Sequence, residues 1–244
     1  MTIHTNDTRD LYGKKLTARD GEIGHIQDFY FDDSAWVIRY VVVDTGTWLT
    51  GRLVLLAPYA FEDFGQNGNT LHLKLSKKQI QDSPSIATHE TVSQQFEEHY
   101  YRSYGWPVYW QGGEMWGMSG DPLALEPLPR EIAVRKALEP VADRHLQSTR
   151  TVVGYHIHAA DGNIGHVSSF HVNSRNWAVQ ELVVETGHWF SGKQILVSPG
   201  DVERISHVEK KVFVKLTKAD IQRTAEDNLA RVGDESHSAH QFAD

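Results

Sequence analysis

The chain has 244 residues, of which 40% are hydrophobic and 10% aromatic, which suits a globular protein of one large or two small domains. Its formal net charge of -8 leaves no excess of lysine and arginine to neutralise nucleic-acid phosphates, so we expect no nucleic-acid partner. The absence of cysteine excludes disulfides, thiolate metal sites and cysteine nucleophiles. No apolar run reaches the length of a membrane span, and residues 1–20 lack the apolar stretch of a signal peptide, which favours a cytoplasmic protein.

The chain contains a long internal repeat. Residues 20–84 align with residues 161–225 without a gap, and about a third of the aligned positions are identical. The phrase VVDTGTWLTGRLVLLAP, residues 42–58, returns as VVETGHWFSGKQILVSP, residues 183–199. A repeat of this length indicates a duplicated domain. We therefore predict a first domain over residues 1–84, a connecting insert over 85–149, a second domain over 150–232 and a disordered tail over 233–244.

Short strands dominate the first copy. Residues 23–31 and 37–43 are rich in β-branched and aromatic residues, and the turn sequence DDSA between them is typical of a hairpin. The segment RLVLLAP, which ends at Pro58, predicts a further strand, and TLHLKL alternates as half-buried strands do. Ser76, followed three residues later by Gln79, predicts a helix that begins with a capping box.

The second copy repeats these signals in the same order. KQILVSP ends at Pro199, and KVFVKL alternates like its counterpart in the first copy. Thr217 and Asp220 take the places of the first capping pair. We expect the second helix to continue through residues 221–232, since IQRTAEDNLARV lacks a helix breaker before its end.

Repeated glycines indicate how these strands are bent. A glycine at a strand end permits a positive φ or a bulge, and short, strongly bent sheets can close on themselves to remove their edges. We therefore predict a mainly β fold of two tandem small antiparallel barrels, each ending in a short capped helix and joined by the insert. The structural turn residues are predicted to be Gly21, Gly24, Gly46, Gly51, Gly162, Gly165, Gly187 and Gly192.

The insert carries a dense aromatic segment, QQFEEHYYRSYGWPVYWQGGEMWGM, over residues 94–118. A solvated linker would not carry so many rings, so something must cover them. Either the rings pack against a barrel as an internal clasp, or some stay exposed as anchors for a partner. The interaction candidates are Tyr104, Trp106, Tyr109, Trp110 and Trp116, together with Trp48 and Trp189 from the two barrels. The rest of the insert reads as a loop punctuated by proline.

Three histidines are weak candidates for a metal site. His156 and His158 have the spacing of neighbours on one strand face, and they would chelate Zn²⁺ if His171 arrived from an adjacent strand. The equivalent residues of the first copy are Lys15 and Thr17, so this site would belong to the second copy alone. A structural role is favoured for these three weak candidates, and we expect no metal and no cofactor. No nucleophile, phosphate loop or HExxH pattern points to catalysis.

The repeated unit resembles the PRC-barrel domain. The resemblance rests on DGEIGHIQDFYFDD and the following VVDTGTWLTGRLVLLAP, and it covers roughly residues 8–84 and 150–225, with departures at Ser169, Asn173 and Ser174. The family includes the cytoplasmic domain of the photosynthetic reaction centre H subunit and the C-terminal domain of a ribosome maturation factor. Both use the barrel to dock on other macromolecules, so the resemblance implies a docking module and transfers no catalytic residues.

Two hypotheses about function follow from these patterns. The first is a non-enzymatic interaction or adapter module, in which a pseudo-twofold pair of barrels binds a protein partner or a second copy of the chain. The second is a protein that binds a small ligand or a metal, with the aromatic insert as a lid.

Overall fold

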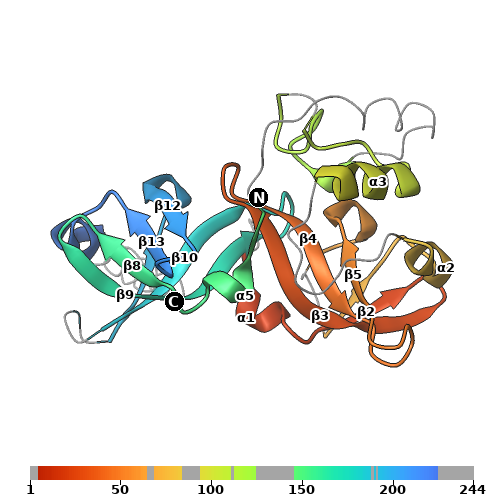
Figure 1. Ribbon diagram of the computed structural model, residues 1–244, viewed down its shortest axis with the longest axis horizontal. Coiled ribbons are helices and arrows are strands. Elements are labelled where there is room, and N and C mark those ends of the chain that lie inside the picture. Colours follow the sequence, from red (N-terminus) through yellow and green to blue (C-terminus); the bar gives the residue numbers. More distant parts are fainter. Residues whose placement is uncertain are drawn as a thin grey trace, which may run out of the picture. The chain divides into compact units, whose positions relative to one another are not determined.

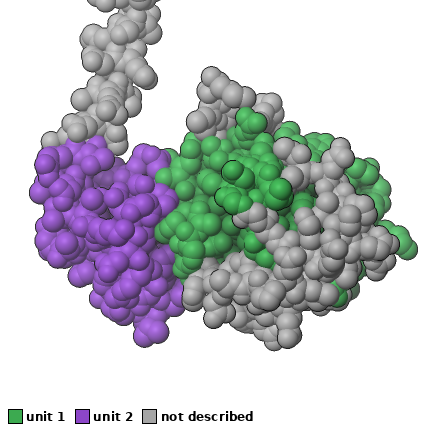
Figure 2. Space-filling view, turned by 90° about the horizontal axis from the view of Figure 1, so that it is seen from above, with its two compact units in different colours: residues 1–150, 170–180 green, residues 151–169, 181–244 purple. Residues whose placement is uncertain are grey.

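The computed structural model describes residues 5–64, 69–83, 94–110, 113–124, 146–187, 190 and 192–224, and these residues are mainly in β structure. The chain divides into two compact units, shown in Figure 2. Unit 1 comprises residues 1–150 and 170–180, and unit 2 comprises residues 151–169 and 181–244. Each unit is built around one sheet. The predicted tail, and the predicted continuation of the last helix beyond residue 224, lie outside the described residues.

The sheet of unit 1 is built on a long hairpin, as the sequence predicted. Its strands have the order β5-β4-β3-β2-β6. The central strands β3 and β4, labelled in Figure 1, are antiparallel, and their paired residues run from His25↔Asp44 to Asp32↔Val37. The strands are β2 (Lys15–Ala18), β3 (Gly21–Asp32), β4 (Val37–Asp44), β5 (Leu53–Leu56) and β6 (Thr70–His72).

Two features correct the prediction of closed antiparallel barrels. Strand β6 pairs in parallel with β2, and the described strands of this sheet form an open path from β5 to β6. Pro58 explains the opening, because it begins a 3-10 turn, η1 (Pro58–Ala60), and a proline cannot donate to a strand ladder. The chain therefore turns after β5, and only then does Phe61 form an isolated bridge with Leu73.

The short helix α2 (Lys77–Gln81) confirms the predicted capping box. The Ser76 side chain accepts from the backbone N–H of Gln79, and the Gln79 side chain accepts from the backbone N–H of Ser76. Asp20 also accepts from the Lys77 N–H at 2.7 Å, which ties the β2–β3 turn to the beginning of the helix.

Two pairs of very short elements were not predicted from the sequence. The N-terminal strand β1 (Thr5–Asp7) leads into helix α1 (Thr8–Leu11) and pairs antiparallel with the end of β9 at residues 171–173. Strand β7 (Leu146–Ser148) leads into helix α5 (Thr149–Val152) and pairs antiparallel with the end of β3. The aligned elements β1 and β7 thus pair with the far ends of each other's long hairpins.

The sheet of unit 2 repeats the strand order of the first. Its path is β11-β10-β9-β8-β13-β12, again with one parallel pair, β8 with β13, and again open among the described residues. The strands are β8 (His156–Ala159), β9 (Gly162–Asn173), β10 (Val179–Thr186), β11 (Gln194–Val197), β12 (Val202–Ser206) and β13 (Lys211–Val214), with the turn η4 (Pro199–Asp201) after β11. Residues 218–224 are helical, and Thr217 and Asp220 exchange the predicted capping bonds.

The predicted turn glycines have the expected backbone, with one exception. All of them except Gly187 have a positive φ. Gly24 and Gly165 are under a second constraint, because a Cβ there would lie 1.9 Å from the Asp44 carbonyl oxygen and 2.0 Å from that of Glu185. These two glycines therefore permit a close crossing of neighbouring strands in both sheets.

The core of unit 1 is strongly aromatic. Trp177, at the turn between β9 and β10, is fully buried and stacks on Phe64 with 3.6 Å between ring centroids. Phe61 packs against both of these rings, and Phe31 contacts Phe170. Residues from both halves of the sequence therefore share this core.

Candidate functional site

Helix α3 (Gln94–Tyr104) begins the aromatic insert and contacts the edge of the first sheet. The Tyr100 hydroxyl donates to the Leu55 carbonyl oxygen at 3.1 Å and accepts from the Ala57 N–H at 2.8 Å. Tyr100 is fully buried, and burial raises its pKa well above the ordinary value. One hydroxyl thus satisfies two backbone groups at the outer edge of β5.

A buried carboxylate secures the same helix. Glu97 is 4% exposed and accepts from the hydroxyls of Tyr40 at 2.8 Å and Tyr109 at 2.7 Å. Burial, followed by the charge of Glu97, raises the pKa of Tyr40 well above its usual range. These contacts join strand β4, helix α3 and the segment after it.

Arg39 of β4 binds the later part of the insert. Its guanidinium lies 3.9 Å from the centroid of the Tyr109 ring and 4.9 Å from that of Trp116. It donates to the Met115 carbonyl oxygen at 2.7 Å and pairs with Asp32 at 3.3 Å. This buried guanidinium therefore contacts two aromatic rings and also has a counter-ion.

Most candidate anchors of the insert are inside this cluster. Trp106, Tyr109 and Trp116 are buried, whereas Tyr104 and Trp110 are half-buried. Tyr104 stacks on Trp106 at 4.3 Å, and burial raises the pKa of Tyr104 to about 12. This packing favours the clasp over the exposed patch as the role of these rings. Of the barrel candidates, Trp48 is half-buried, and the Lys77 ammonium nitrogen lies 5.1 Å from the centroid of its ring. Trp189 lies outside the described residues.

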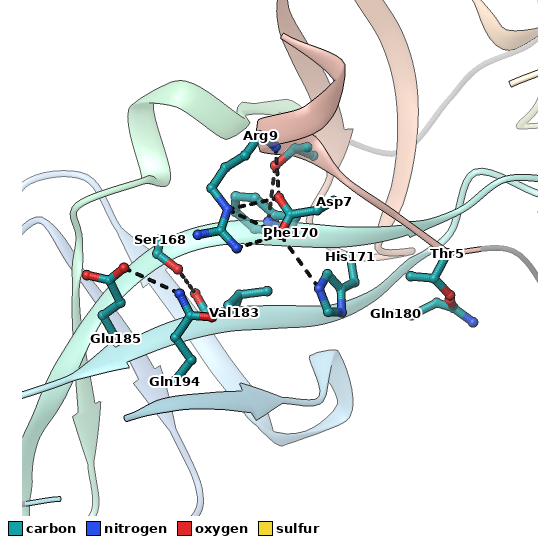
Figure 3. Close-up of polar contacts among 11 residues, drawn as sticks. Thr5, Asp7, Arg9, Ser168, Phe170, His171, Gln180, Val183, Glu185 and Gln194 are labelled. Carbon is teal, nitrogen blue, oxygen red and sulfur yellow. Dashed lines mark hydrogen bonds and ion pairs between the residues drawn. The ribbon is translucent and has the colours of Figure 1, made fainter. Parts of the chain in front are cut away.

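The equivalent edge of unit 2 has a different environment. Leu196 of β11 aligns with Leu55 of β5, yet its exposed fraction is 39%, against 1% for Leu55. The neighbouring Gln194 is also exposed, and its side-chain amide donates to Glu185 of β10 at 3.4 Å (Figure 3). This surface could not be predicted from the sequence, because the aligned leucines are identical and only the position of the insert distinguishes them.

The structure gives the three candidate metal ligands separate surroundings. His156 is exposed beside Asn163, and His158 packs edge-on to Phe213 with 5.4 Å between ring centroids. His171 lies 3.7 Å from the Asp7 carboxylate, which also binds Arg9 (Figure 3). Within the described ranges, no three His, Asp or Glu side chains come together as a metal site.

A pocket of about 410 Å³ lies in unit 1 where the repeated turn motif meets β2 and β3. Lys15, Glu22, His25 and Trp48 are among its lining residues. Lys15 pairs with Glu22 at 3.3 Å, and His25 lies 4.0 Å from Asp44. Because Lys15 and His25 each have an acidic neighbour, the pocket favours no single charge of ligand.

The comparisons with known proteins concern the first copy. Residues 5–78 match the PRC-barrel domain, a region that contains β1 to β6 and the beginning of α2. No curated protein matches the chain. None of the helices in the described part of the chain is long and apolar enough to cross a membrane.

Proposed function

We propose that the chain is a non-enzymatic protein-interaction module built from two PRC-barrel domains, the first in residues 1–84 and the second in residues 150–232. The second sheet supports this assignment because it repeats the strand order and the parallel pair of the first. It also repeats a specific contact, since Asp161 accepts from the Lys218 N–H at 3.0 Å as Asp20 does from Lys77.

The exposure of Leu196 is the observation that carries the proposal. In unit 1 the aromatic insert covers the β4–β5 edge of the sheet and bonds to its backbone. At the same edge of unit 2, the aligned Leu196 has 39% of its surface exposed, whereas the covered Leu55 has 1%. We therefore assign the β11 edge as the surface that receives a protein partner.

The buried polar groups of unit 1 support a structural role for the insert. Arg39, Glu97 and Tyr100 all bond to other groups of the chain, and these bonds join the insert to β4 and β5. Such a network fixes one arrangement of buried side chains. The insert is therefore proposed to be a docked segment that shows, within one chain, how this sheet edge is recognised.

Quantitative affinity purification from the native cell tests the proposal. The wild type is compared with Leu196→Glu and with Val208→Glu, a matched control because Val208 is 97% exposed on the β12–β13 turn. We expect Leu196→Glu to lose a partner that Val208→Glu retains, with equal melting temperatures for both variants. Equal partner recovery in all three proteins would reject β11 as the docking edge.

A further inference from the structure

We propose that the β11 edge binds a helix with a tyrosine and, three residues before it, a lysine or arginine. This inference rests on the proposed function and names the chemistry of the partner. The template is the contact that helix α3 makes with β5, where Glu97 and Tyr100 have this spacing.

The backbone groups that bind Tyr100 have direct counterparts in unit 2. Leu196 O and Ser198 N take the places of Leu55 O and Ala57 N. Ala57 precedes η1 with φ -72° and ψ 154°, and Ser198 precedes η4 with φ -69° and ψ 140°, so the two chains leave their strands in the same way. The described part of the chain provides no hydrogen-bond partner for Ser198 N.

Strand register indicates that the Leu196 backbone also faces outward. Leu196 is paired with Val183 of β10, and the Val183 carbonyl accepts from the Ser168 hydroxyl of β9 at 3.1 Å (Figure 3). In an antiparallel ladder, paired residues either exchange both backbone bonds or direct both sets away from each other. The N–H and C=O of Leu196 therefore point away from β10, as the Leu55 carbonyl does when it accepts from Tyr100.

At one position the surface of unit 2 carries an acidic residue where unit 1 has a hydroxyl that donates to the acidic Glu97 of the insert. Glu181 aligns with Tyr40, the residue that donates to Glu97 of α3. Glu181 already has an interaction within the chain, but a carboxylate has acceptor sites for more than one partner, so it would still repel an acidic residue and attract a lysine or arginine. Gly200 likewise aligns with Tyr59, whose ring contacts Tyr101 and Trp116, so the partner has room for a large side chain of its own.

Synthetic peptides of residues 94–110 provide the probe, and they are added to the full chain. The unmodified peptide is compared with its Glu97→Lys form and with a form carrying Glu97→Lys and Tyr100→Phe. We expect the Glu97→Lys peptide to bind about tenfold more tightly than the unmodified peptide. Adding Tyr100→Phe should weaken the affinity of that peptide about fivefold to tenfold, because one buried hydrogen-bonding hydroxyl is lost. Changes in the NMR chemical shifts of the Leu196 and Ser198 amides on adding peptide should show that it binds at the β11 edge.

Variants of the full chain distinguish this mode from nonspecific binding. Glu181→Gln should abolish the preference for the lysine peptide, Leu196→Glu should abolish binding, and Val208→Glu should change neither. Equal affinity of all peptides, a preference that survives Glu181→Gln, or no binding at millimolar peptide would overturn the inference. If Leu196→Glu still loses its cellular partner in the last case, the proposed function stands and only this recognition mode fails.

Discussion

At the scale of single residues, the aligned short helices α1 and α5 each begin beside one carboxylate, but the carboxylate comes from a different position in each copy. Asp7 caps α1 directly and accepts from the Arg9 N–H. The aligned residue before α5 is Ser148, and there Asp28 of β3 accepts from Ser148, Thr149 and the Arg150 N–H. Ser169 aligns with Asp28, so the acid and the serine have exchanged places between the two copies. A negative charge beside the first N–H groups of each helix is thus kept.

This exchange predicts a rescue. Asp28→Ser should lower the free energy of unfolding by about 1–3 kcal/mol, because the Ser148 and Thr149 hydroxyls and the Arg150 N–H lose the carboxylate that accepts from them. Adding Ser148→Asp should recover most of the loss, since the double variant reproduces the pair Asp7 and Ser169. Urea unfolding of the three proteins measures both effects. A double variant less stable than Asp28→Ser would contradict this account of the exchange.

A second prediction at this scale concerns Gly24. Gly24→Ala should cost more than about 3 kcal/mol, because its Cβ would lie 1.9 Å from the Asp44 carbonyl and the strands would have to separate. Gly13→Ala is the control, since its φ of +76° is strained for alanine but nothing lies within 4 Å. It should cost only about 1–2 kcal/mol. Equal losses of stability in both variants would mean that backbone conformation alone, and not the contact with Asp44, explains the cost of Gly24→Ala.

At the scale of elements, the insert binds the first sheet through directed polar groups within an aromatic cluster. Tyr100→Phe removes the donor to Leu55 O and the acceptor for Ala57 N, so we expect a loss of about 1–3 kcal/mol in the free energy of unfolding. Tyr101→Phe is the matched control, because the Tyr101 hydroxyl is buried without a hydrogen-bond partner. Its removal should be neutral or stabilising, and denaturant unfolding distinguishes the two. A Tyr101→Phe loss as large as that of Tyr100→Phe would contradict the edge-capping role.

Local signals made some elements predictable and long-range contacts decided the rest. The hairpin and the Ser76–Gln79 capping box depend on neighbouring residues, so sequence patterns sufficed. Strands β1 and β7 have three residues each, too few to show a period, and their pairing joins segments far apart in the chain. The parallel pairs and the open sheets also depend on such contacts. The different exposure of Leu55 and Leu196 could not be read from two identical residues.

At the scale of the whole molecule, buried tyrosines should make stability sensitive to alkaline pH. Burial raises the pKa of Tyr40, Tyr100 and Tyr101 well above 10, and it raises that of Tyr12 to about 12. In the unfolded chain these hydroxyls ionise near pH 10. Because the folded pKa values are the higher ones, the stability that the neutral hydroxyls contribute is complete below pH 10 and is lost as pH rises toward the folded values.

Each tyrosine that stays protonated in the folded state should lower the free energy of unfolding by about 1.4 kcal/mol per pH unit above 10. Denaturant unfolding between pH 9 and pH 11.5 measures this slope, and tyrosinate absorbance reports ionisation directly. Tyr101→Phe, expected to be neutral at pH 7, should reduce the slope by the share of one tyrosine. An unchanged slope in that variant would mean that the Tyr101 hydroxyl ionises without unfolding, and therefore that the insert opens to water while the sheets remain folded.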